Sequence, residues 1–457
     1  MPLKFVFGPS GSGKSTYLYQ HVIEESEKYP LKNFIVLVPE QFTMQTQKDL
    51  VSMHPRHGIM NIDVLSFARL AYRVFEETGT KQMQVLDDEG KNLILRKIAG
   101  DYENKLTVLK GNIKKLGYIS EVKSVISEFT QYDIGEEEMD EMLDHLDEDS
   151  RLYYKLKDIR LLYEGFQDYL RERYITKEEL LDVLNSQVKE SELLKNSVVV
   201  LDGFTGFTPV QNRLILELMR CCKEVWVTVT MDERENPYAY KHPYQLFGLS
   251  KQMVTTLVRM AGEDHIEVEE PVCLYGYPVK RFEKNQELAF LERNIFRYGS
   301  GRYDKAVENL EIHAAGNPRQ EADAVAEGIR RLVRKEQYRY RDIGVIVSDM
   351  NVYGDYLEQA FENYGIPVFM DHKRSILLNS FVEYIRSLLN MAEKNFSYES
   401  VFRFLRTNLA GFACEEVDEL ENYVLGLGIR GYKGWQNRWI RRLKGMEEEE
   451  LDRLNHY

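Results

Sequence analysis

The stretch LKFVF-GPSGSGKST, residues 3–16, decides how the rest of the chain is interpreted. Residues 3–7 are mostly apolar and rich in β-forming side chains, which predicts a buried strand. Residues 8–15 match the pattern G-x-x-x-x-G-K-[ST] in full, and residues 16–27 have the apolar spacing of a helix. This pattern binds phosphate when it lies between a buried strand and a helix. The stretch therefore predicts a nucleotide-binding loop in an α/β sheet.

The residue types of this loop explain the predicted chemistry. Glycines let the backbone fold tightly, so that successive amide groups point at one anion, and the helix N-terminus adds partial positive charge. Lys14 is expected to reach the β- and γ-phosphates of ATP, and the Ser15 hydroxyl to hold Mg²⁺. The predicted nucleotide-binding residues are Gly8, Ser10, Gly11, Ser12, Gly13, Lys14, Ser15 and Thr16. An ordinary Gly/Ser-rich turn is the disfavoured alternative, because pattern and context agree.

Composition places the chain among globular proteins of several domains. Its 457 residues are enough for about two to four domains. The net charge of −14 lacks the basic footprint of a protein that coats nucleic acid, and the local basic clusters are interpreted as solvated helix faces. Because we find no long apolar run and no signal peptide, we expect a cytoplasmic protein without membrane contact. The cysteines have no C-x-x-C spacing and are expected to be buried, reduced thiols.

Strands alternate with helices after the loop, which predicts a parallel sheet. Further strands are expected at residues 33–38, 59–65, 197–202 and 225–230, with Ser66 as the N-cap of a helix. Between the third and fourth of these five strands, apolar residues recur at helical spacing. The expected division is therefore a first α/β domain over residues 1–85 and 196–285, interrupted by a helical insertion over residues 86–195.

A second α/β domain is predicted over residues 286–380. Its expected strands are residues 310–315, 343–347 and 366–369. The chain then turns helical, and residues 381–457 are interpreted as the start of another helical insertion. Because the last residues have the pattern of a helix interior, we interpret the sequence as the front part of a longer protein.

A second motif supplies an acid for the nucleotide site. Asp202 follows an apolar strand, where it can position Mg²⁺ together with Ser15. The next residue is Gly203, whereas helicases that hydrolyse ATP usually have a glutamate there. The sequence thus keeps the groups that bind nucleotide and lacks one that splits it, and no catalytic residue is assigned. Glu224 and Asp232 are possible substitute bases, with nothing in favour of either.

Together these segments resemble a known family. Two α/β units with helical insertions resemble superfamily 1 helicases of the UvrD type, which are P-loop NTPases with two RecA-like domains. The segment SFARLA at residues 66–71 resembles the Ser-Phe segment that follows the second strand of these helicases. Their second motor domain is resembled by residues 321–329, 340–347, 357–358 and 365–368. More narrowly, the chain resembles the AddB subunits of AddAB helicase–nucleases, in VPEQFT at 38–43, LDGF at 201–204, NPRQEA at 317–322, ENYVL at 421–425 and GIRG at 428–431.

The resemblance implies a role in processing double-strand DNA ends for recombinational repair. AddB-type subunits pair with an AddA-type helicase–nuclease subunit and bind single-stranded and double-stranded DNA. The helicase-like part is implied to be an inactive motor that scans single-stranded DNA for the Chi sequence, with ATP and Mg²⁺ as cofactors. The exonuclease motif, a 4Fe-4S cluster and the arginine finger belong to a region absent from this sequence, so the four cysteines are not interpreted as cluster ligands.

DNA contacts in such folds come from loops after the strands and from aromatic side chains that stack on bases. The candidates are Gln41, Phe42, Thr43, Ser66, Phe67, Arg69, Phe204 and Thr208. For the aromatic members, core packing explains the residue type equally well.

Two other classes of function remain open. The chain could be an active, DNA-stimulated ATPase or helicase motor in its own right, which requires a base and an arginine finger that we do not find. A P-loop kinase-like enzyme acting on a small molecule is disfavoured by the long helical insertion and the second α/β domain.

Overall fold

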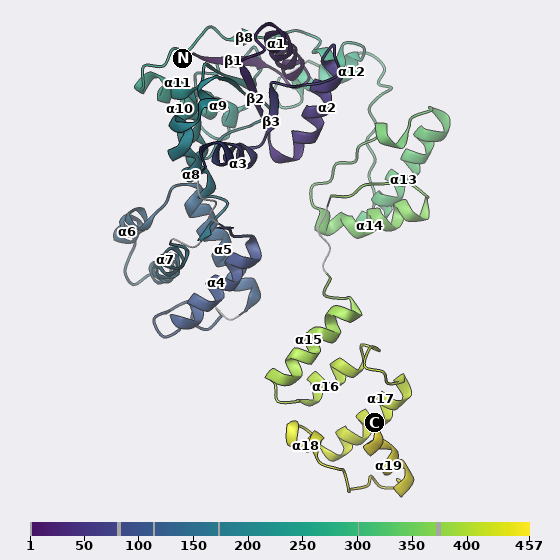
Figure 1. The fold of residues 1–457 in the computed structure, drawn as a ribbon. Coiled ribbons are helices and arrows are strands. Elements are labelled where there is room, and N and C mark those ends of the chain that lie inside the picture. The colour runs from purple at the N-terminus through teal and green to yellow at the C-terminus, as the bar shows by residue number, and fades with distance from the viewer. Residues whose placement is uncertain (1, 80–83, 113–114, 172–173, 300, 372–375) are drawn as a thin grey trace. The chain divides into compact units, whose positions relative to one another are not determined.

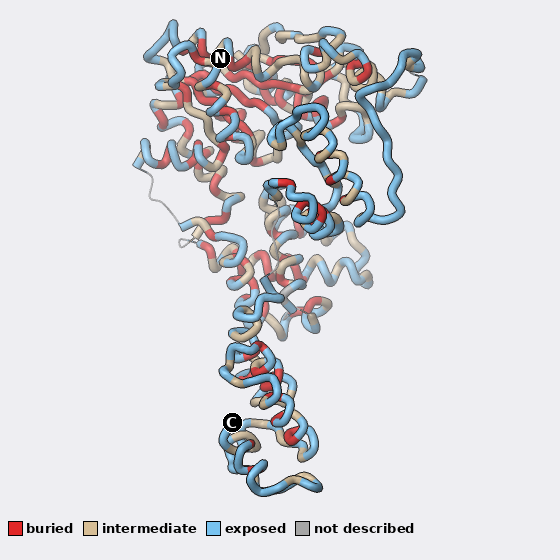
Figure 2. The backbone as a smooth tube through the Cα atoms, turned by 90° about the vertical axis from the view of Figure 1, so that its right-hand side faces the viewer, coloured by how far each residue is buried: buried red, intermediate tan, exposed pale blue. Residues whose placement is uncertain are grey.

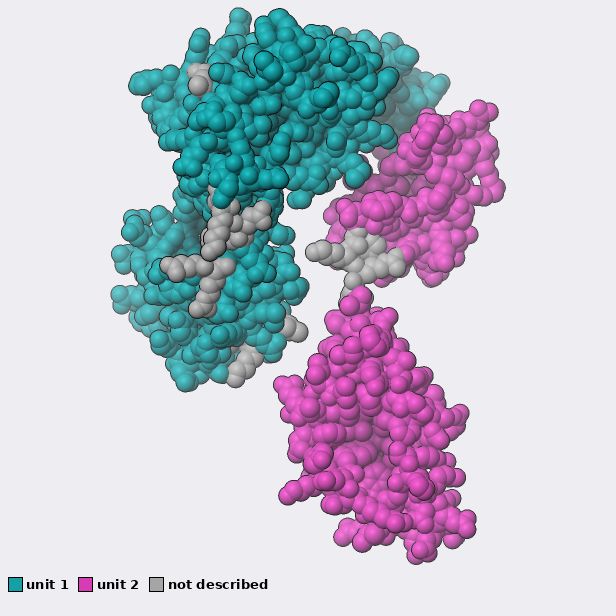
Figure 3. Space-filling view, in the orientation of Figure 1, with its two compact units in different colours: residues 1–311 teal, residues 312–457 magenta. Residues whose placement is uncertain are grey.

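The computed structural model describes residues 2–457 except 80–83, 113–114, 172–173, 300 and 372–375 (Figure 1). The chain divides into two compact units, residues 1–311 and 312–457, which are coloured separately in Figure 3. Each unit is described by itself.

The first unit is built on a six-stranded parallel sheet with the strand order β3-β2-β6-β7-β1-β8. Four strands after β1 follow the apolar runs that the sequence predicts, whereas the short edge strand β8 was not predicted. Their bounds are β1 Leu3–Gly8, β2 Asn33–Leu37, β3 Ile62–Leu65, β6 Ser197–Leu201, β7 Glu224–Thr230 and β8 Val272–Cys273. Every residue of β6 is buried, as expected for a parallel sheet covered on both faces.

Helices cover both faces of this sheet, and Figure 2 shows its strands as the main buried region of the unit. On one face α1 (Lys14–Lys28) and α2 (Thr43–Met53) pack against alternate side chains of the strands. On the other face the same strands contact α3 (Phe67–Thr78), α10 (Pro209–Cys221) and α11 (Gly248–Glu263). The loops after parallel strands all lie at the carboxyl edge of the sheet, which is where the candidate residues gather.

The helical insertion forms between β3 and β6 and has a hydrophobic core of its own. Its helices are α4 Asp88–Asp101, α5 Leu116–Gln131, α6 Glu136–Asp144 and α7 Arg151–Leu170. A short parallel ladder of β4 (Gln84–Val85) and β5 (Tyr174–Ile175), which was not predicted, joins its ends. The following helix α8 (Leu180–Gln187) packs against the sheet core instead.

The second unit differs from the sequence prediction in its strands. Residues 310–315, 343–347 and 366–369 carry no strand assignment, and no ladder joins them within the described part of the chain. The side chains of Ile312, Ile346 and Phe369 are almost fully exposed. A strand requires a paired neighbour as well as a suitable residue pattern, and the three strands predicted here were therefore wrong.

The described remainder of this unit is mainly helical, as the sequence predicts for residues 381–457. Helices α13 (Pro318–Lys335) and α14 (Met350–Asn363) share one hydrophobic cluster. The remaining helices share another and are α15 Ser380–Glu393, α16 Tyr398–Leu405, α17 Cys414–Leu427, α18 Tyr432–Gln436 and α19 Glu448–His456. The division into domains made from the sequence stays a prediction.

Two further expectations concern the burial of the cysteines and the absence of a membrane-spanning helix. All four cysteines are free thiols, but Cys273 and Cys414 are exposed, so the expectation of burial was wrong for these two. Among the helices that the structure describes, none is both long and apolar enough to cross a membrane.

Candidate functional site

The glycine-rich loop connects β1 to α1 with the backbone geometry that its glycines permit. Gly11 and Gly13 have φ angles of +82° and +94°, in the left-handed region that side chains disfavour. A Cβ atom on Gly11 would also lie 2.8 Å from the Cβ of Arg281. The loop therefore needs glycine at these positions for its turn and for the approach of a distant segment.

A cavity of about 480 Å³ lies beside this loop, at the carboxyl edge of the sheet. It contains most of the predicted nucleotide-binding residues together with Asp202, the predicted magnesium ligand. Its lining is Ser10, Gly11, Gly13, Lys14, Ser15, Thr16, Asp202, Gly203, Phe204, Thr205, Thr228, Thr230, Lys280 and Arg281. Gly8 and Ser12 do not line it. They shape the loop from beneath, and the buried Ser12 hydroxyl has no hydrogen-bond partner among the described residues.

Lys14 folds back over the loop. Its Nζ donates to the carbonyl oxygens of Gly8 at 2.8 Å and Pro9 at 2.9 Å. Burial lowers the pKa of Lys14 to about 8, the charge of Asp202 opposes this shift, and that of Arg281 adds to it. Among the described residues this ammonium group donates to neutral carbonyls alone, which it can exchange for an anion.

For the nucleotide site that the sequence predicts, this pKa implies an affinity that depends on pH. Phosphate binds the charged form of Lys14, so above pH 8 binding must take up a proton. We expect the affinity for ATP to fall as pH rises from 7 to 9, approaching about tenfold per pH unit above the pKa. Equilibrium titrations at several pH values measure this. An affinity that stays flat over this range would show that the pKa of Lys14 is not lowered to about 8, or that Lys14 does not contribute to binding.

Asp202 is the only carboxylate among the described residues that line the cavity. It is buried and directly follows β6, and Gly203 after it has a φ angle of +80°. The hydroxyl of Ser15 and the carboxylate of Asp202 thus border one cavity. This donor set fits Mg²⁺, which takes one or two protein oxygens and completes its shell with water and phosphate oxygens.

The two substitute bases considered from the sequence lie outside the cavity. Glu224 begins β7, at the opposite edge of the sheet, where it accepts a hydrogen bond from Trp226. Asp232 pairs with Arg234 and Arg297, and the hydrogen bond from Arg234 is the main reason why its pKa falls to about 2. Glu224 therefore lies away from the loop, whereas Asp232 borders a small neighbouring cavity that also contains Pro9 of the loop.

Sequence reasoning missed two basic residues of the cavity. Lys280 and Arg281 lie in the short 3₁₀ helix η3 (Lys280–Phe282), and the backbone amide of Arg281 donates to the carbonyl of Gly11 at 3.0 Å. The Lys280 side chain lies close to Gly13. No local pattern marks this pair, because its position beside the loop depends on chain folding over more than 260 intervening residues.

The candidate DNA-contact residues follow β2, β3 and β6, which are neighbours in the sheet. Phe67 and Phe204 lie together, with ring centroids 5.4 Å apart, and Phe207 completes the cluster. Phe67 is buried in the core, whereas Phe204 and Phe207 are only half-buried. Core packing thus accounts for Phe67, and the other two rings keep an accessible side.

The polar candidates have mixed surroundings. Ser66 and Thr208 cap α3 and α10 through hydrogen bonds from the amides of Arg69 and Gln211. Thr43 is buried and donates to the carbonyl of Glu40. The remaining candidates are exposed and are Gln41, Phe42 and Arg69.

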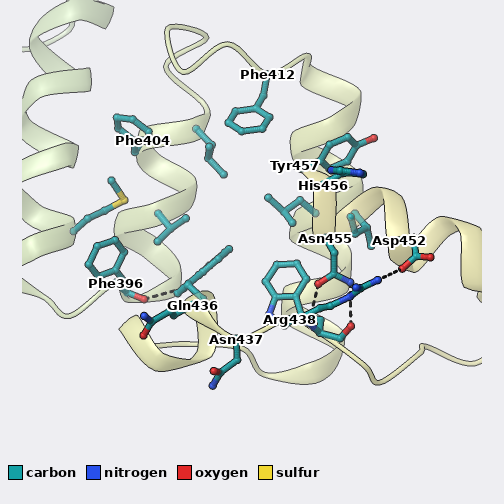
Figure 4. Close-up of a pocket in the computed structure, with 17 residues that line it drawn as sticks. Phe396, Phe404, Phe412, Gln436, Asn437, Arg438, Asp452, Asn455, His456 and Tyr457 are labelled. Carbon is teal, nitrogen blue, oxygen red and sulfur yellow. Dashed lines mark hydrogen bonds and ion pairs between the residues drawn. The ribbon is translucent and has the colours of Figure 1, made fainter.

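Two larger cavities lie in residues 312–457. One, of about 910 Å³, borders the extended segments next to α13 and α14. The other, of about 760 Å³, lies among the last helices, where Figure 4 shows Phe396, Phe404 and Phe412 around it and Arg438 paired with Asp452. Both are mainly apolar, and in neither do lysine, serine and aspartate converge as they do beside the glycine-rich loop.

The fold and the cavity define a class of protein. Its parallel sheet is covered by helices on both faces, and a pocket lined by basic side chains lies beside the glycine-rich loop that follows the first strand. The family described as "ADDB, N-terminal" matches residues 5–292, so the chain belongs to the AddB family.

Named relatives agree with this assignment. Proteins named as the B subunits of an ATP-dependent helicase/deoxyribonuclease from Lachnoclostridium phytofermentans, Caldanaerobacter subterraneus and Clostridium acetobutylicum are 44%, 36% and 32% identical over the whole chain. The chain spans 39% to 40% of the length of these relatives.

Proposed function

We propose that residues 1–311 are a P-loop, RecA-like module that binds ATP with Mg²⁺ in the cavity beside the glycine-rich loop. The observation that carries the proposal is the convergence of Lys14, Ser15 and Asp202 with Lys280 and Arg281 around one cavity. Three cationic side chains and one carboxylate suit a triphosphate with its metal ion. The loop after β1 and the helical insertion between β3 and β6 support a superfamily 1 arrangement.

We further propose that the module serves a two-subunit helicase/deoxyribonuclease. The relatives are named as B subunits, which implies a partner chain, here one of the AddA type. The proposed substrate is DNA at double-strand ends during recombinational repair. Single-stranded DNA would contact the loops after β2, β3 and β6, where Phe42, Phe204 and Phe207 offer accessible rings for base stacking.

Within this role we propose an inactive motor that scans single-stranded DNA for Chi. Gly203 has no side chain to orient water, and no second carboxylate lines the described part of the cavity. An active motor is the alternative and would need a base from elsewhere. The nuclease activity and the 4Fe-4S cluster are proposed for the parent protein and not for this chain.

One paired measurement tests the motor assignment. On the full-length protein, we expect micromolar or tighter ATP binding with Mg²⁺, but no increase in steady-state ATP hydrolysis when single-stranded DNA is added. The physical reason is that the cavity holds groups for the phosphates and none for the attacking water. Brisk DNA-stimulated ATP hydrolysis would favour the alternative of an active motor. Failure to bind ATP would refute the proposed nucleotide site itself.

A further inference from the structure

Two hydroxyl groups hold the buried carboxylate at the end of β6. The Tyr19 hydroxyl donates to Oδ2 of Asp202 at 2.7 Å, and the Thr228 hydroxyl donates to Oδ1 at 2.6 Å. Tyr19 lies on α1, five residues after Lys14, and Thr228 lies on β7. Two neighbouring elements therefore orient Asp202 from outside its own strand.

Tyr19 can act only as a donor toward Asp202. Burial, and next the charge of Asp202, raise the pKa of Tyr19 far above its usual value, so the hydroxyl stays protonated. The Oγ1 atom of Thr46, on α2, lies 3.4 Å from the same hydroxyl oxygen. Since the Tyr19 proton is directed at Asp202, its oxygen is left to accept from Thr46. The position of the hydroxyl is thus fixed by three elements, α1, α2 and β6.

Orientation matters because Mg²⁺ demands near-ideal octahedral geometry and is reluctant to lose its water. A carboxylate has about four lone-pair sites, so two hydroxyl donors leave the others available for the cation or a water bound to it. A carboxylate in one fixed orientation presents those lone pairs without a further loss of side-chain freedom.

We propose that Tyr19 is a positioning residue for magnesium, whose hydroxyl holds the Asp202 carboxylate in the orientation that receives the cation accompanying the nucleotide phosphates. The proposal rests on the nucleotide binding proposed above and extends it to a residue outside the glycine-rich pattern. Tyr19 lies in the interior of α1, where its ring belongs to the core between the sheet and the helix. The aromatic ring and the hydroxyl therefore have separable roles.

The test measures how much Mg²⁺ improves nucleotide affinity. The Kd of the slowly hydrolysed analogue ATPγS is determined on the full-length protein, once with Mg²⁺ and once with EDTA. The variants are Tyr19→Phe, which keeps the ring in the core, and Thr228→Val, which removes the other hydroxyl with little change of shape. Tyr17→Phe is the matched control, because it removes a hydroxyl from the same helix that makes no described contact with Asp202.

In Tyr19→Phe we expect the ratio of the Kd in EDTA to the Kd in Mg²⁺ to fall about tenfold, the size associated with one hydrogen bond to a charged group. The Kd in EDTA should stay within about twofold, because the phosphate-binding loop is untouched. Thr228→Val should lower the same ratio, and Tyr17→Phe should leave it unchanged.

Two results would overturn the role of Tyr19. One is an unchanged ratio in Tyr19→Phe, and the other is an equal loss of affinity in both buffers, which a merely structural role produces. If the unaltered protein binds no ATPγS in either buffer, nucleotide binding itself is refuted, and the role of Tyr19 is refuted with it. The measurement on the unaltered protein thus separates the two failures.

Discussion

Lys14→Ala is expected to abolish nucleotide binding while leaving the fold intact. Lys14 is less exposed than Lys280 and Arg281, and its ammonium group donates to two neutral carbonyl oxygens, which a phosphate can replace. Loss of its charge-assisted hydrogen bonds removes about 3 kcal/mol, or more than 100-fold in affinity. The measurement is an equilibrium titration with ATP and Mg²⁺, alongside thermal unfolding of the same samples.

Lys28→Ala is the matched control for this prediction. Lys28 is the last residue of the same helix and is solvent-exposed, so its removal should leave ATP affinity unchanged. Any residual ATP binding by Lys14→Ala should lack the pH dependence expected for the unaltered protein, because the titrating group is gone. A Lys14→Ala variant that bound ATP with normal affinity would refute the assignment of the glycine-rich loop as a nucleotide site.

Asp158→Ala is expected to destabilise the helical insertion severely. This buried carboxylate on α7 accepts hydrogen bonds from the backbone amides of Thr107 at 2.9 Å and of Val108 and Leu109 at 2.8 Å. The hydroxyl of Thr107 donates to it as well, at 3.0 Å. Alanine would remove all these hydrogen bonds and leave the buried Leu109 amide without this partner, at a cost of about 3 kcal/mol. Amide hydrogen exchange of α4, α5 and α7 reports this loss directly.

Asp168→Ala provides the comparison on the same helix. Asp168 is exposed, and among the described residues it forms an ion pair with the exposed Arg171, so its removal should change stability by less than about 0.5 kcal/mol. Exchange in the six-stranded sheet should stay unchanged in both variants, because the insertion has its own core. If Asp158→Ala exchanged no faster than Asp168→Ala, the carboxylate would not organise the 107–109 segment.

The sequence was most informative where local pattern and tertiary role coincide. Residues 3–7 are apolar because both faces of β1 are covered, so the strand could be recognised without knowledge of its neighbours. The glycine pattern likewise encodes a local backbone geometry, which the φ angles of Gly11 and Gly13 confirm. The helical insertion was recognisable from its apolar spacing, because each of its helices buries one face.

The sequence was misleading where structure depends on a partner. Residues 343–347 have the composition of a strand, but in the described chain they pair with no other strand, and Ile346 faces solvent. The opposite error concerns β8, a strand that the sequence did not predict. Val272 and Cys273 join the edge of the sheet because they pair with β1, but a strand of two residues is too short to show an alternating pattern. Strand formation in both cases is decided by hydrogen-bonded neighbours, which composition does not reveal.

By itself, the sequence determined the strand, the glycine-rich loop and the helix that opens the chain, and it singled out Lys14, Ser15 and Asp202. These follow from short-range rules, since each depends on residues within a few positions. Only the tertiary structure decided that Lys280 and Arg281 face this loop, that Glu224 and Asp232 do not line its cavity, and that Tyr19 and Thr228 hold Asp202. Such contacts join segments far apart in the chain, and the packing of the sheet and its helices creates them.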